Sequence, residues 1–485
     1  MSESPLDAVI VGAGPNGLAA AIVLAEAGRR VRVLEANDDV GGAARSAELT
    51  SDGFLHDLGS TTHPLAAASP FLRQLPLGEH GLEWVQADLP VAHPLDDGRA
   101  VMHHRSLDET AAGLGPDAEA WIDLFGPLTA DWPRLEREIL RPLLHWPRHP
   151  VALARFGLPA LRSAEGLARS RFETTEARAL FAGHAAHSLL ALDQAASASF
   201  GLVLGTLAHR VGWPCPRGGA GRITAALASY LRSIGGEIET NRRIELVDDL
   251  PPARNVVFDL TPRQVLRITG EALPRRPRQA LVRFRYGTAA YKVDWALDGP
   301  IPWANPACGR AGTMHLGGTL EEIAAGERTV ADGGTPDAPF VLLAQHSLFD
   351  PTRAPDGGHT VWAYCHVPNA STVDMTDRIE TQIERFAPGF RQRILERAVS
   401  PPAELERQNA NLIGGDINGG AQDLAQMFAR PHLSPRPYRL TRGGGDGSPG
   451  LYMCSSSTPP GGGVHGMCGW HAARTVLHDT RRRGR

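Results

Sequence analysis

The sequence of 485 residues is almost without lysine: of its 49 basic residues, Lys292 is the only lysine and the others are arginine. A high content of alanine, arginine and glycine accompanies this preference, which indicates a coding bias that replaced lysine wherever arginine served. Arginine is planar and permanently charged, whereas an ammonium group is compact and can lose its proton. Lys292 is therefore either chemically required or a chance survivor of that bias.

Cysteine is also scarce. The chain has five cysteines, and the closest two, Cys454 and Cys468, are 14 positions apart. No C-x-x-C occurs, so the sequence predicts neither a redox dithiol nor a zinc site, and no metal is expected. An odd number of dispersed cysteines fits a reducing compartment, and we expect a cytoplasmic protein.

Charge of one sign and long apolar runs are lacking as well. The formal net charge is −4, which gives no reason to expect a nucleic-acid partner. No apolar run reaches the roughly 18 residues of a membrane span, and the N-terminal residues lack the basic segment of a secretory signal. With 42% hydrophobic residues, the chain can form two or three modules with substantial cores.

What the sequence does contain is a nucleotide-binding pattern at its start. Residues 7–38 read DAVIVGAGPNGLAAAIVLAEAGRRVRVLEAND. The apolar run at 8–11 predicts a strand, the segment up to about Ala27 predicts a helix that Gly28 ends, and residues 31–34 predict a second strand. This order of strand, glycine turn, helix and strand is that of a dinucleotide-binding unit.

The turn of this unit has the spacing G-x-G-x-x-G. Gly12 permits a tight turn, Gly14 lets the backbone approach a pyrophosphate, and Gly17 lets helix and strand pack closely. The start of the helix directs N–H groups and a positive dipole end toward the phosphates. Glu35 follows the second strand, where a carboxylate accepts hydrogen bonds from ribose hydroxyls and repels a 2′-phosphate. The alternative is a glycine-rich structural turn without a ligand.

Two segments after this unit narrow the choice of cofactor. DDVGGAARS (38–46) carries the pattern G-G-x-x-R, and FLHDLGSTTHP (54–64) follows it. Here the chain resembles the superfamily of flavin-dependent amine oxidases and phytoene desaturases, in which this arginine and these glycines lie beside the flavin diphosphate. The resemblance implies bound FAD, held non-covalently, rather than a transient NAD. The further residues that we expect at the cofactor in this half of the chain are Pro15, Asn16, Ala36, Gly41, Gly42, Ala43, Arg45, Gly59, Ser60 and Thr61.

The C-terminal part has the same order of strand, glycine turn and helix. In GLYMCSSSTPPGGGVHGMCGWHAA (450–473), residues 451–454 predict a buried strand, the glycines at 461–463 predict a close turn, and a helix is expected from about His465. This segment resembles the C-terminal signature of phytoene dehydrogenase-like oxidoreductases, in which the last strand and helix pack onto the dinucleotide domain. The resemblance places Gly462, Gly463, Val464 and His465 at the flavin ring, and a strand around 243–246, which contains Arg243 and Ile244, at the adenine.

The expected fold class is α/β, with a Rossmann-type FAD-binding domain and an α+β substrate domain. The FAD-binding domain is discontinuous and is expected to comprise residues 1–65, 214–280 and 440–485. Residues 66–213, whose apolar residues have helical spacing, predict a helical cap, and residues 281–439 predict the sheet part of the substrate domain.

Two details of the substrate domain follow from the pattern. Runs such as TMHLGG and HTVWAYCHV within 281–367 predict an antiparallel sheet without intervening helices, and residues 376–399 predict a helix. Residues 153–172 mix leucine and phenylalanine with four arginines. That mixture is typical of a helix on a membrane surface, but a glycine and a proline interrupt it, which favours a cap over a pocket and leaves weak membrane contact as the alternative.

Three residues are candidates for chemistry beside the flavin. Lys292 shares one face of a predicted strand with Asp294. By resemblance to amine oxidases it holds a water at flavin N5; alternatively the two residues form a surface ion pair. His465 either works as an acid–base group or caps its own helix. Asp416, in the glycine-rich loop NLIGGDINGG, either lines the pocket or is structural.

We therefore expect an FAD-dependent oxidoreductase that oxidises, desaturates or isomerises an apolar organic substrate of isoprenoid or carotenoid-like character by hydride transfer to flavin N5. Oxygen or a quinone is the expected electron acceptor. Two alternatives remain. One is a flavin amine oxidase, which a cage of two aromatic side chains near the flavin would support, and the other is a non-catalytic protein that binds FAD and interacts with partners.

Overall fold

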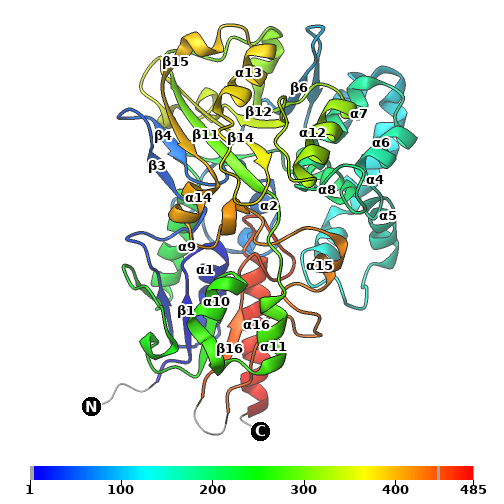
Figure 1. The fold of residues 1–485 in the computed structure, drawn as a ribbon. Coiled ribbons are helices and arrows are strands. Elements are labelled where there is room, and N and C mark those ends of the chain that lie inside the picture. Colours follow the sequence, from blue (N-terminus) through cyan, green and yellow to red (C-terminus); the bar gives the residue numbers. More distant parts are fainter. Residues whose placement is uncertain (1–4, 445–447, 484–485) are drawn as a thin grey trace.

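Five parallel strands form the sheet in the lower part of the molecule (Figure 1). The computed structural model describes residues 5–444 and 448–483. β1 lies in the middle of this sheet, and all four of its residues are buried. The strand order is β16 (Gly450–Met453), β10 (Asn255–Phe258), β1 (Ala8–Val11), β2 (Val31–Leu34) and β9 (Glu237–Glu239).

Helices cover both faces of this sheet, which explains why its central strands are continuous apolar runs. α1 (Pro15–Glu26), α9 (Gly221–Ser233) and α16 (Met467–Arg483) share one core with the sheet. α10 (Pro262–Thr269) and α11 (Arg275–Val282) contribute to the core on the other face. α1 lies against both α9 and α16, so segments from the beginning, middle and end of the chain build one module.

A second sheet, of seven strands, forms the upper part of the molecule (Figure 1). Neighbouring strands are antiparallel except β12 and β6, which are parallel. The strand order is β15 (Ile394–Ser400), β11 (Ala289–Leu297), β14 (His359–Val367), β13 (Val341–Ala344), β12 (Ala311–Leu316), β6 (Leu89–Pro94) and β7 (Ala100–His103). Two small antiparallel pairs are β3 (Ser46–Glu48) with β4 (Leu55–Asp57), and β5 (Trp84–Val85) with β8 (Cys215–Pro216).

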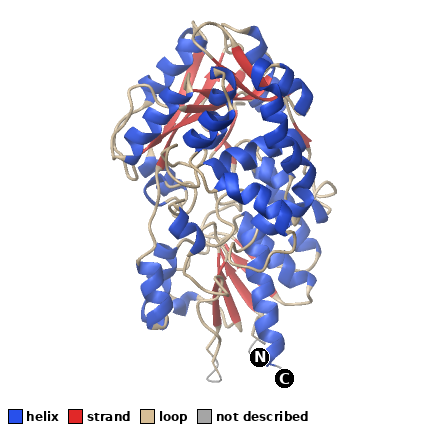
Figure 2. Cartoon of the chain, turned by 90° about the vertical axis from the view of Figure 1, so that its right-hand side faces the viewer, coloured by secondary structure: helices blue, strands red, loops and turns tan. Residues whose placement is uncertain are grey.

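A layer of helices packs against one face of the second sheet (Figure 2). Trp121 and Phe125 of this layer share a core with Trp362 and Tyr364 of β14. The helices are α2 (Pro64–Ala67), α3 (Leu107–Ala112), α4 (Ala118–Ile139), α5 (Pro150–Ala160), α6 (Ala164–Arg171), α7 (Thr175–Ala186), α8 (Ala198–Arg210) and α12 (Leu320–Ala331). α13 (Thr376–Phe386) packs on the other face, and α14 (Pro402–Gln408) and α15 (Leu424–Phe428) complete the set. Among the residues described, no helix combines the length and apolar composition that crossing a bilayer requires.

The predicted α/β fold class is confirmed, and the strands expected at 8–11 and 31–34 occur at those positions. Three predictions about the second module are wrong. α12 interrupts the run of strands, residues 394–400 form the edge strand β15 rather than a helix, and β6 and β7 come from the segment predicted as helical. β6 contains two prolines, which mask a strand, and the charged residues of β15 are exposed, as an edge strand permits.

The contact between α16 and α1 gives a test of how the end of the chain is held. A β-carbon at Gly469 of α16 would lie 1.9 Å from the carbonyl oxygen of Asn16. We expect Gly469→Ala to lower the free energy of unfolding by about 1–3 kcal/mol or more, because the helices have to separate. Gly157 is the matched control: it lies inside α5 with no atom within 4 Å of its added β-carbon. Gly157→Ala should be neutral or stabilising by up to about 1 kcal/mol. Equal denaturation midpoints for the two variants would contradict this packing.

Candidate functional site

A cavity of about 300 Å³ lies where the carboxyl ends of the parallel strands face the seven-stranded sheet. Gly14, Asp259 and Ser455, which follow β1, β10 and β16, line it from one side. Lys292 of β11 and Trp362 of β14 line it from the other. Open parallel sheets bind their ligands outside the carboxyl ends of the strands, so this position marks the cavity as the candidate site.

Two glycine turns approach each other at one end of the cavity. A β-carbon at Gly14 would lie 2.6 Å from Oδ2 of Asp259, and one at Gly42 would lie 3.2 Å from the Cα of Gly14. Gly12 has a φ of 102°, which a residue with a side chain rarely adopts. The turns that contain Gly12, Gly14 and Gly42 therefore form a surface of backbone without side chains, which we call the glycine cradle. The predicted cofactor residues that line the cavity are Gly14, Pro15, Asn16, Gly42, Ala43, Gly59, Ser60, Thr61, Gly463 and Val464.

Glu35 lies beside the cavity rather than on its wall. Its Oε2 accepts a hydrogen bond of 2.8 Å from the N–H of Ala13, and its Oε1 accepts one of 3.0 Å from the N–H of Asn37. The carboxylate therefore ties the end of β2 to the first glycine turn. The other predicted cofactor residues that lie off the cavity wall are Gly12, Gly17, Ala36, Gly41, Arg45, Arg243, Ile244, Gly462 and His465.

Arg45 holds the second glycine turn in place. Its Nε donates to the carbonyl of Gly42 at 3.0 Å, and one of its terminal nitrogens donates to the carbonyl of Gln408 at 2.9 Å. Gln408 ends α14. The arginine of the G-G-x-x-R pattern thus joins the two modules.

The strand predicted around 243–246 is not present. The strand at this edge of the parallel sheet, next to β2, is instead β9. Arg243 is exposed, and Ile244 is buried in the core. Asn241 turns the chain with a φ of 55°, and the charged residues that follow remain in solvent. The backbone nevertheless passes Glu35, since the N–H of Arg242 donates to its carbonyl at 2.7 Å.

The C-terminal turn lies against α2. A β-carbon at Gly463 would lie 2.8 Å from Cδ1 of Leu65. His465 is buried away from the cavity wall, and its Nδ1 accepts a hydrogen bond of 3.0 Å from the N–H of Met467, the first residue of α16. Burial lowers the pKa of His465 to about 4. Of its two predicted roles, the geometry favours the helix cap.

Lys292 lines the cavity and is only 3% exposed. Its Nζ forms an ion pair with Asp294, which is fully buried, so the predicted pair exists but does not lie on the surface. Burial raises the pKa of Asp294 to about 6, and the charge of Lys292 acts in the opposite direction. The other carboxylate oxygen lies 3.7 Å from Nδ1 of His56. β11 thus presents one ammonium group to the cavity.

Asp416 supports the cavity wall from behind. Its carboxylate accepts hydrogen bonds of 2.8 Å from the N–H groups of Gly287 and Asn418. Burial raises the pKa of Asp416. Its neighbours Ile417 and Asn418 line the cavity, while Asp416 does not, which favours its structural role.

Asp259 is a site residue that the sequence analysis missed. It follows β10 directly, and its Oδ2 accepts a hydrogen bond of 2.8 Å from the N–H of Gly17. Burial raises the pKa of Asp259 to about 7, and the charge of Glu35 adds to this effect. An acidic residue directly after a predicted central strand was the signal available. His63 and His187 also line the cavity, and nothing in the local sequence points to either.

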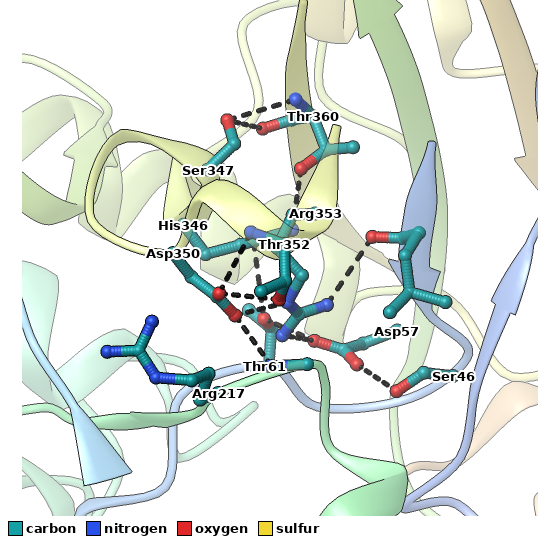
Figure 3. Close-up of polar contacts among 12 residues, drawn as sticks. Ser46, Asp57, Thr61, Arg217, His346, Ser347, Asp350, Thr352, Arg353 and Thr360 are labelled. Carbon is teal, nitrogen blue, oxygen red and sulfur yellow. Dashed lines mark hydrogen bonds and ion pairs between the residues drawn. The ribbon is translucent and has the colours of Figure 1, made fainter. Parts of the chain in front are cut away.

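A buried polar network lies next to the cavity (Figure 3). Asp57 accepts hydrogen bonds from Ser46 at 2.6 Å, from Thr61 at 2.6 Å and from Arg353 at 2.9 Å. Arg353 also donates to Asp350 at 3.0 Å, and both partners of Arg353 are fully buried. Burial by itself would raise the pKa of Asp57, but the Arg353 guanidinium holds it well below its usual range. Because Thr61 lines the cavity, this network fixes part of the wall.

Histidine, cysteine, aspartate and glutamate are the side chains that bind metal ions in proteins. Across residues 5–444 and 448–483, no group of three or more histidine, cysteine, aspartate or glutamate residues has the geometry to hold a metal ion. All five cysteines are buried and free of disulfide bonds.

The chain is similar to known oxidoreductases over nearly its whole length. A family described as an NAD(P)-binding Rossmann-like domain matches residues 10–75. The chain is 28% identical to pyridine nucleotide-disulfide oxidoreductase domain-containing protein 2 of Mus musculus, over 98% of this chain and 93% of the relative. It is 24% identical to the neurosporene-forming phytoene desaturase of Rhodobacter capsulatus, over 95% of this chain and 92% of that one. A solved structure of a putrescine oxidase variant has a TM-score of 0.64 at 19% identity, covering 98% of this chain and 99% of that one. These similarities confirm the predicted resemblance.

The cradle fits FAD, the predicted cofactor, which the relatives bear out. Gly14 and Gly42 both line the cavity, and a β-carbon on either would collide with neighbouring protein atoms, so this part of the wall is backbone. The N-cap residue of α1 is Gly14, which has no side chain, and in the first turn the N–H of Gly17 donates to Asp259. The buried Nδ2 of Asn418, which lines the cavity, is a donor without a partner in the described part of the chain.

The position of Asp259 predicts that FAD binding depends on pH. Because burial raises its pKa to about 7, the carboxyl group is mostly neutral below that pH and negative above it, where it repels the diphosphate. We expect the Kd for FAD to rise about tenfold between about pH 6 and pH 8, equivalent to roughly 1.4 kcal/mol. Asp259→Asn keeps the acceptor for Gly17 without the charge, and its Kd should change less than about twofold. Titration of FAD fluorescence measures both, and equal pH dependence would contradict this assignment.

Proposed function

We propose that the protein is an FAD-dependent oxidoreductase that removes a hydride from a neutral, largely apolar organic substrate. The observation that carries this proposal is the composition of the cavity wall beyond the glycine cradle. That part of the wall is built by the helical layer and the second sheet together. Its apolar and aromatic members include Leu189, Leu204, Trp213, Leu342, Trp362 and Tyr364.

In this proposal the backbone of the chain holds the cofactor. Gly14 and Gly42 leave room for the diphosphate at the start of α1, and Glu35 lies where ribose hydroxyls are bound in such folds. Gly463 and Val464 line the cavity where the C-terminal turn meets α2, which fits contact with the edge of a flat ring. Bound FAD supplies the hydride acceptor, and the chain supplies orientation and exclusion of water.

The charges on the wall favour a neutral substrate. Asp259 is the only carboxylate among the described residues that line the cavity, and it lies at the cofactor end, bonded to Gly17. Lys292 is the cation on the wall, and its charge is paired with Asp294. A substrate ammonium at the apolar end would have no carboxylate of the described wall to pair with, and an unpaired charge in a partly dry cavity is costly.

An amine oxidase is the second candidate, and one observation favours it. Trp362 and Tyr364 both line the cavity, and aromatic faces bind amines. Their ring centroids are 5.2 Å apart, but the rings are edge to face at 79°, and Trp362 is tied to the carbonyl of Gly59. Two rings in this arrangement do not offer parallel faces to one amine, so the neutral substrate is the first candidate.

We propose a membrane surface as the source of such a substrate. Four apolar side chains in and before α5 are well exposed: Leu144 (56%), Trp146 (92%), Val151 (70%) and Leu158 (74%). Apolar side chains beside arginines such as Arg155 fit weak binding to an anionic bilayer. A membrane quinone, as well as oxygen, is therefore proposed as the electron acceptor.

The proposed function is tested by flavin content and reduction. Denatured protein should release FAD into the supernatant, because we expect no covalent link. Under anaerobic conditions, the flavin absorbance should bleach with neutral isoprenoid alcohols or hydrocarbons and not with putrescine or cyclohexylamine. Bleaching by the amines alone would favour an amine oxidase, and FAD that no compound reduces would favour a non-catalytic protein. A preparation that takes up no FAD would refute the proposal.

The Lys292–Asp294 pair predicts separable effects on folding and on chemistry. Lys292→Met leaves the carboxylate of Asp294 buried without its partner, which should cost about 3–5 kcal/mol of unfolding free energy. Lys292→Met combined with Asp294→Asn removes both charges and should recover most of that stability. If the ammonium assists at the flavin, both variants should keep FAD and slow reoxidation by oxygen about tenfold, which is roughly 1.4 kcal/mol of barrier. Stopped-flow measurement of the double variant decides: a rate within about twofold of wild type would remove Lys292 from the chemistry.

A further inference from the structure

Two buried polar atoms face each other behind Lys292. Oδ1 of Asp294 and Nδ1 of His56 are 3.7 Å apart, and both side chains are fully buried. Neither atom forms a hydrogen bond with any residue that the structure describes. Buried polar atoms are normally paired. A proton between these two atoms would pair both after an approach of roughly 0.5–1 Å.

This contact is one link in a line of side chains from the cavity toward the surface. Lys292 lines the cavity, and its Nζ is paired with Oδ2 of Asp294. On the other side of the ring, Nε2 of His56 is hydrogen-bonded to Oγ1 of Thr50 at 2.8 Å. Thr50 is partly exposed and lies in the loop between β3 and β4, near the exposed Asp52. We call these four side chains, from Lys292 to Thr50, the Lys292–Thr50 line.

The two sheets fix the order of this line. Lys292 and Asp294 lie two positions apart on β11, so they share one face of the strand. Their register partners on β14 are Tyr364 and Trp362, which both line the cavity. Asp294 itself lies off the cavity wall, where it meets His56, the middle residue of β4. The line therefore starts at the cavity and leads away from it.

The other titratable groups nearby are bonded elsewhere. Arg353 donates to Asp57 at 2.9 Å, and Nε2 of His346 is hydrogen-bonded to Oγ1 of Thr360 at 2.9 Å. Among the described hydrogen bonds, none joins the side chains of these residues to those of the Lys292–Thr50 line. The line is therefore not branched by its charged neighbours.

The environment gives both inner members of the line a neutral form. Burial lowers the pKa of His56 to about 3; the charge of Lys292 lowers it further, and that of Asp57 acts to raise it. The ring is thus neutral at neutral pH, with one nitrogen protonated and the other free. Burial raises the pKa of Asp294 to about 6, which makes its protonated form accessible.

We propose that Asp294, His56 and Thr50 move protons between Lys292 and solvent, outward and inward in turn. This inference rests on the proposed function, because a neutral substrate that loses a hydride must also lose a proton to stay neutral. Reduction of oxygen to hydrogen peroxide, or of a quinone to a quinol, by that hydride takes up one proton again. Each turnover therefore sends one proton out and brings one in.

The outward step balances atom by atom. Nζ of Lys292 takes the substrate proton and gives one of its own to Asp294, whose carboxyl group turns and passes it to Nδ1 of His56. The ring releases the proton on Nε2 to Thr50, whose hydroxyl proton goes to water. The ring now carries its proton on Nδ1, and the inward step reverses each transfer and restores Nε2–H. No electrons move along the line.

The test uses the fact that the chain has one lysine. Lysine labelled with ¹⁵N at Nζ gives one NMR signal, and its proton exchange with solvent is measured with FAD bound, which covers the cavity side. Thr50→Val removes the hydroxyl, and His56→Gln keeps hydrogen-bonding groups that do not transfer protons. We expect each variant to slow this exchange at least about tenfold. Thr360→Val is the control, because it removes the hydroxyl bonded to His346 beside the line, and its rate should stay within about twofold of wild type.

The direction of the change separates a proton path from a structural role. A variant that only loosens the fold exposes Nζ and speeds its exchange, whereas a lost path slows it. Unchanged or faster exchange in Thr50→Val and His56→Gln would overturn the inference, as would equal slowing in Thr360→Val. Flavin content is measured on the same samples. A protein that takes up no FAD would refute the proposed function, and a yellow protein whose exchange ignores Thr50 and His56 would refute this inference alone.

Discussion

The buried ion pair between Arg353 and Asp57 is the contact on which the position of the cavity depends. Both side chains are fully buried, and a charge in such a place is tolerated only when its partner and its hydrogen bonds are complete. Completing them requires Thr61, Ser46 and Asp350, which come from three separate stretches of chain. The wall that contains Thr61 is thus fixed by charge neutralisation, which apolar packing alone would not specify so narrowly.

The two ends of the cavity are built by different means. At the end that we propose for the cofactor, Gly14, Gly42 and Gly463 have no side chains, so the wall there is backbone. At the other end the wall consists of side chains, which are mostly apolar and include the polar residues Lys292 and His63. A cofactor that many proteins share can be recognised through backbone alone, whereas a particular substrate is recognised through side chains.

This difference explains what the sequence could predict. The glycine turns and the strands at 8–11 and 31–34 follow from local patterns, because the residues that make each element are neighbours in the chain. β6 could not be predicted, since its prolines are tolerated only through the strands beside it. The apolar wall of the cavity could not be predicted either. The N–H of His63 is bonded to the carbonyl of Pro214, and Asp57 is paired with Arg353, 296 positions away. Neither contact can be predicted from a local sequence pattern.

The burial of Lys292 has a consequence for how the protein can be handled and modified. Because the chain has one lysine and that lysine is 3% exposed, the folded surface offers no lysine ammonium to acylating reagents, amine-reactive supports, acetyltransferases or ubiquitin ligases. A label reaches Lys292 either through the cavity that this residue lines or after the sheet around β11 has opened. The rate of lysine acylation therefore reports access to the cavity wall, which an occupant of the cavity would lower.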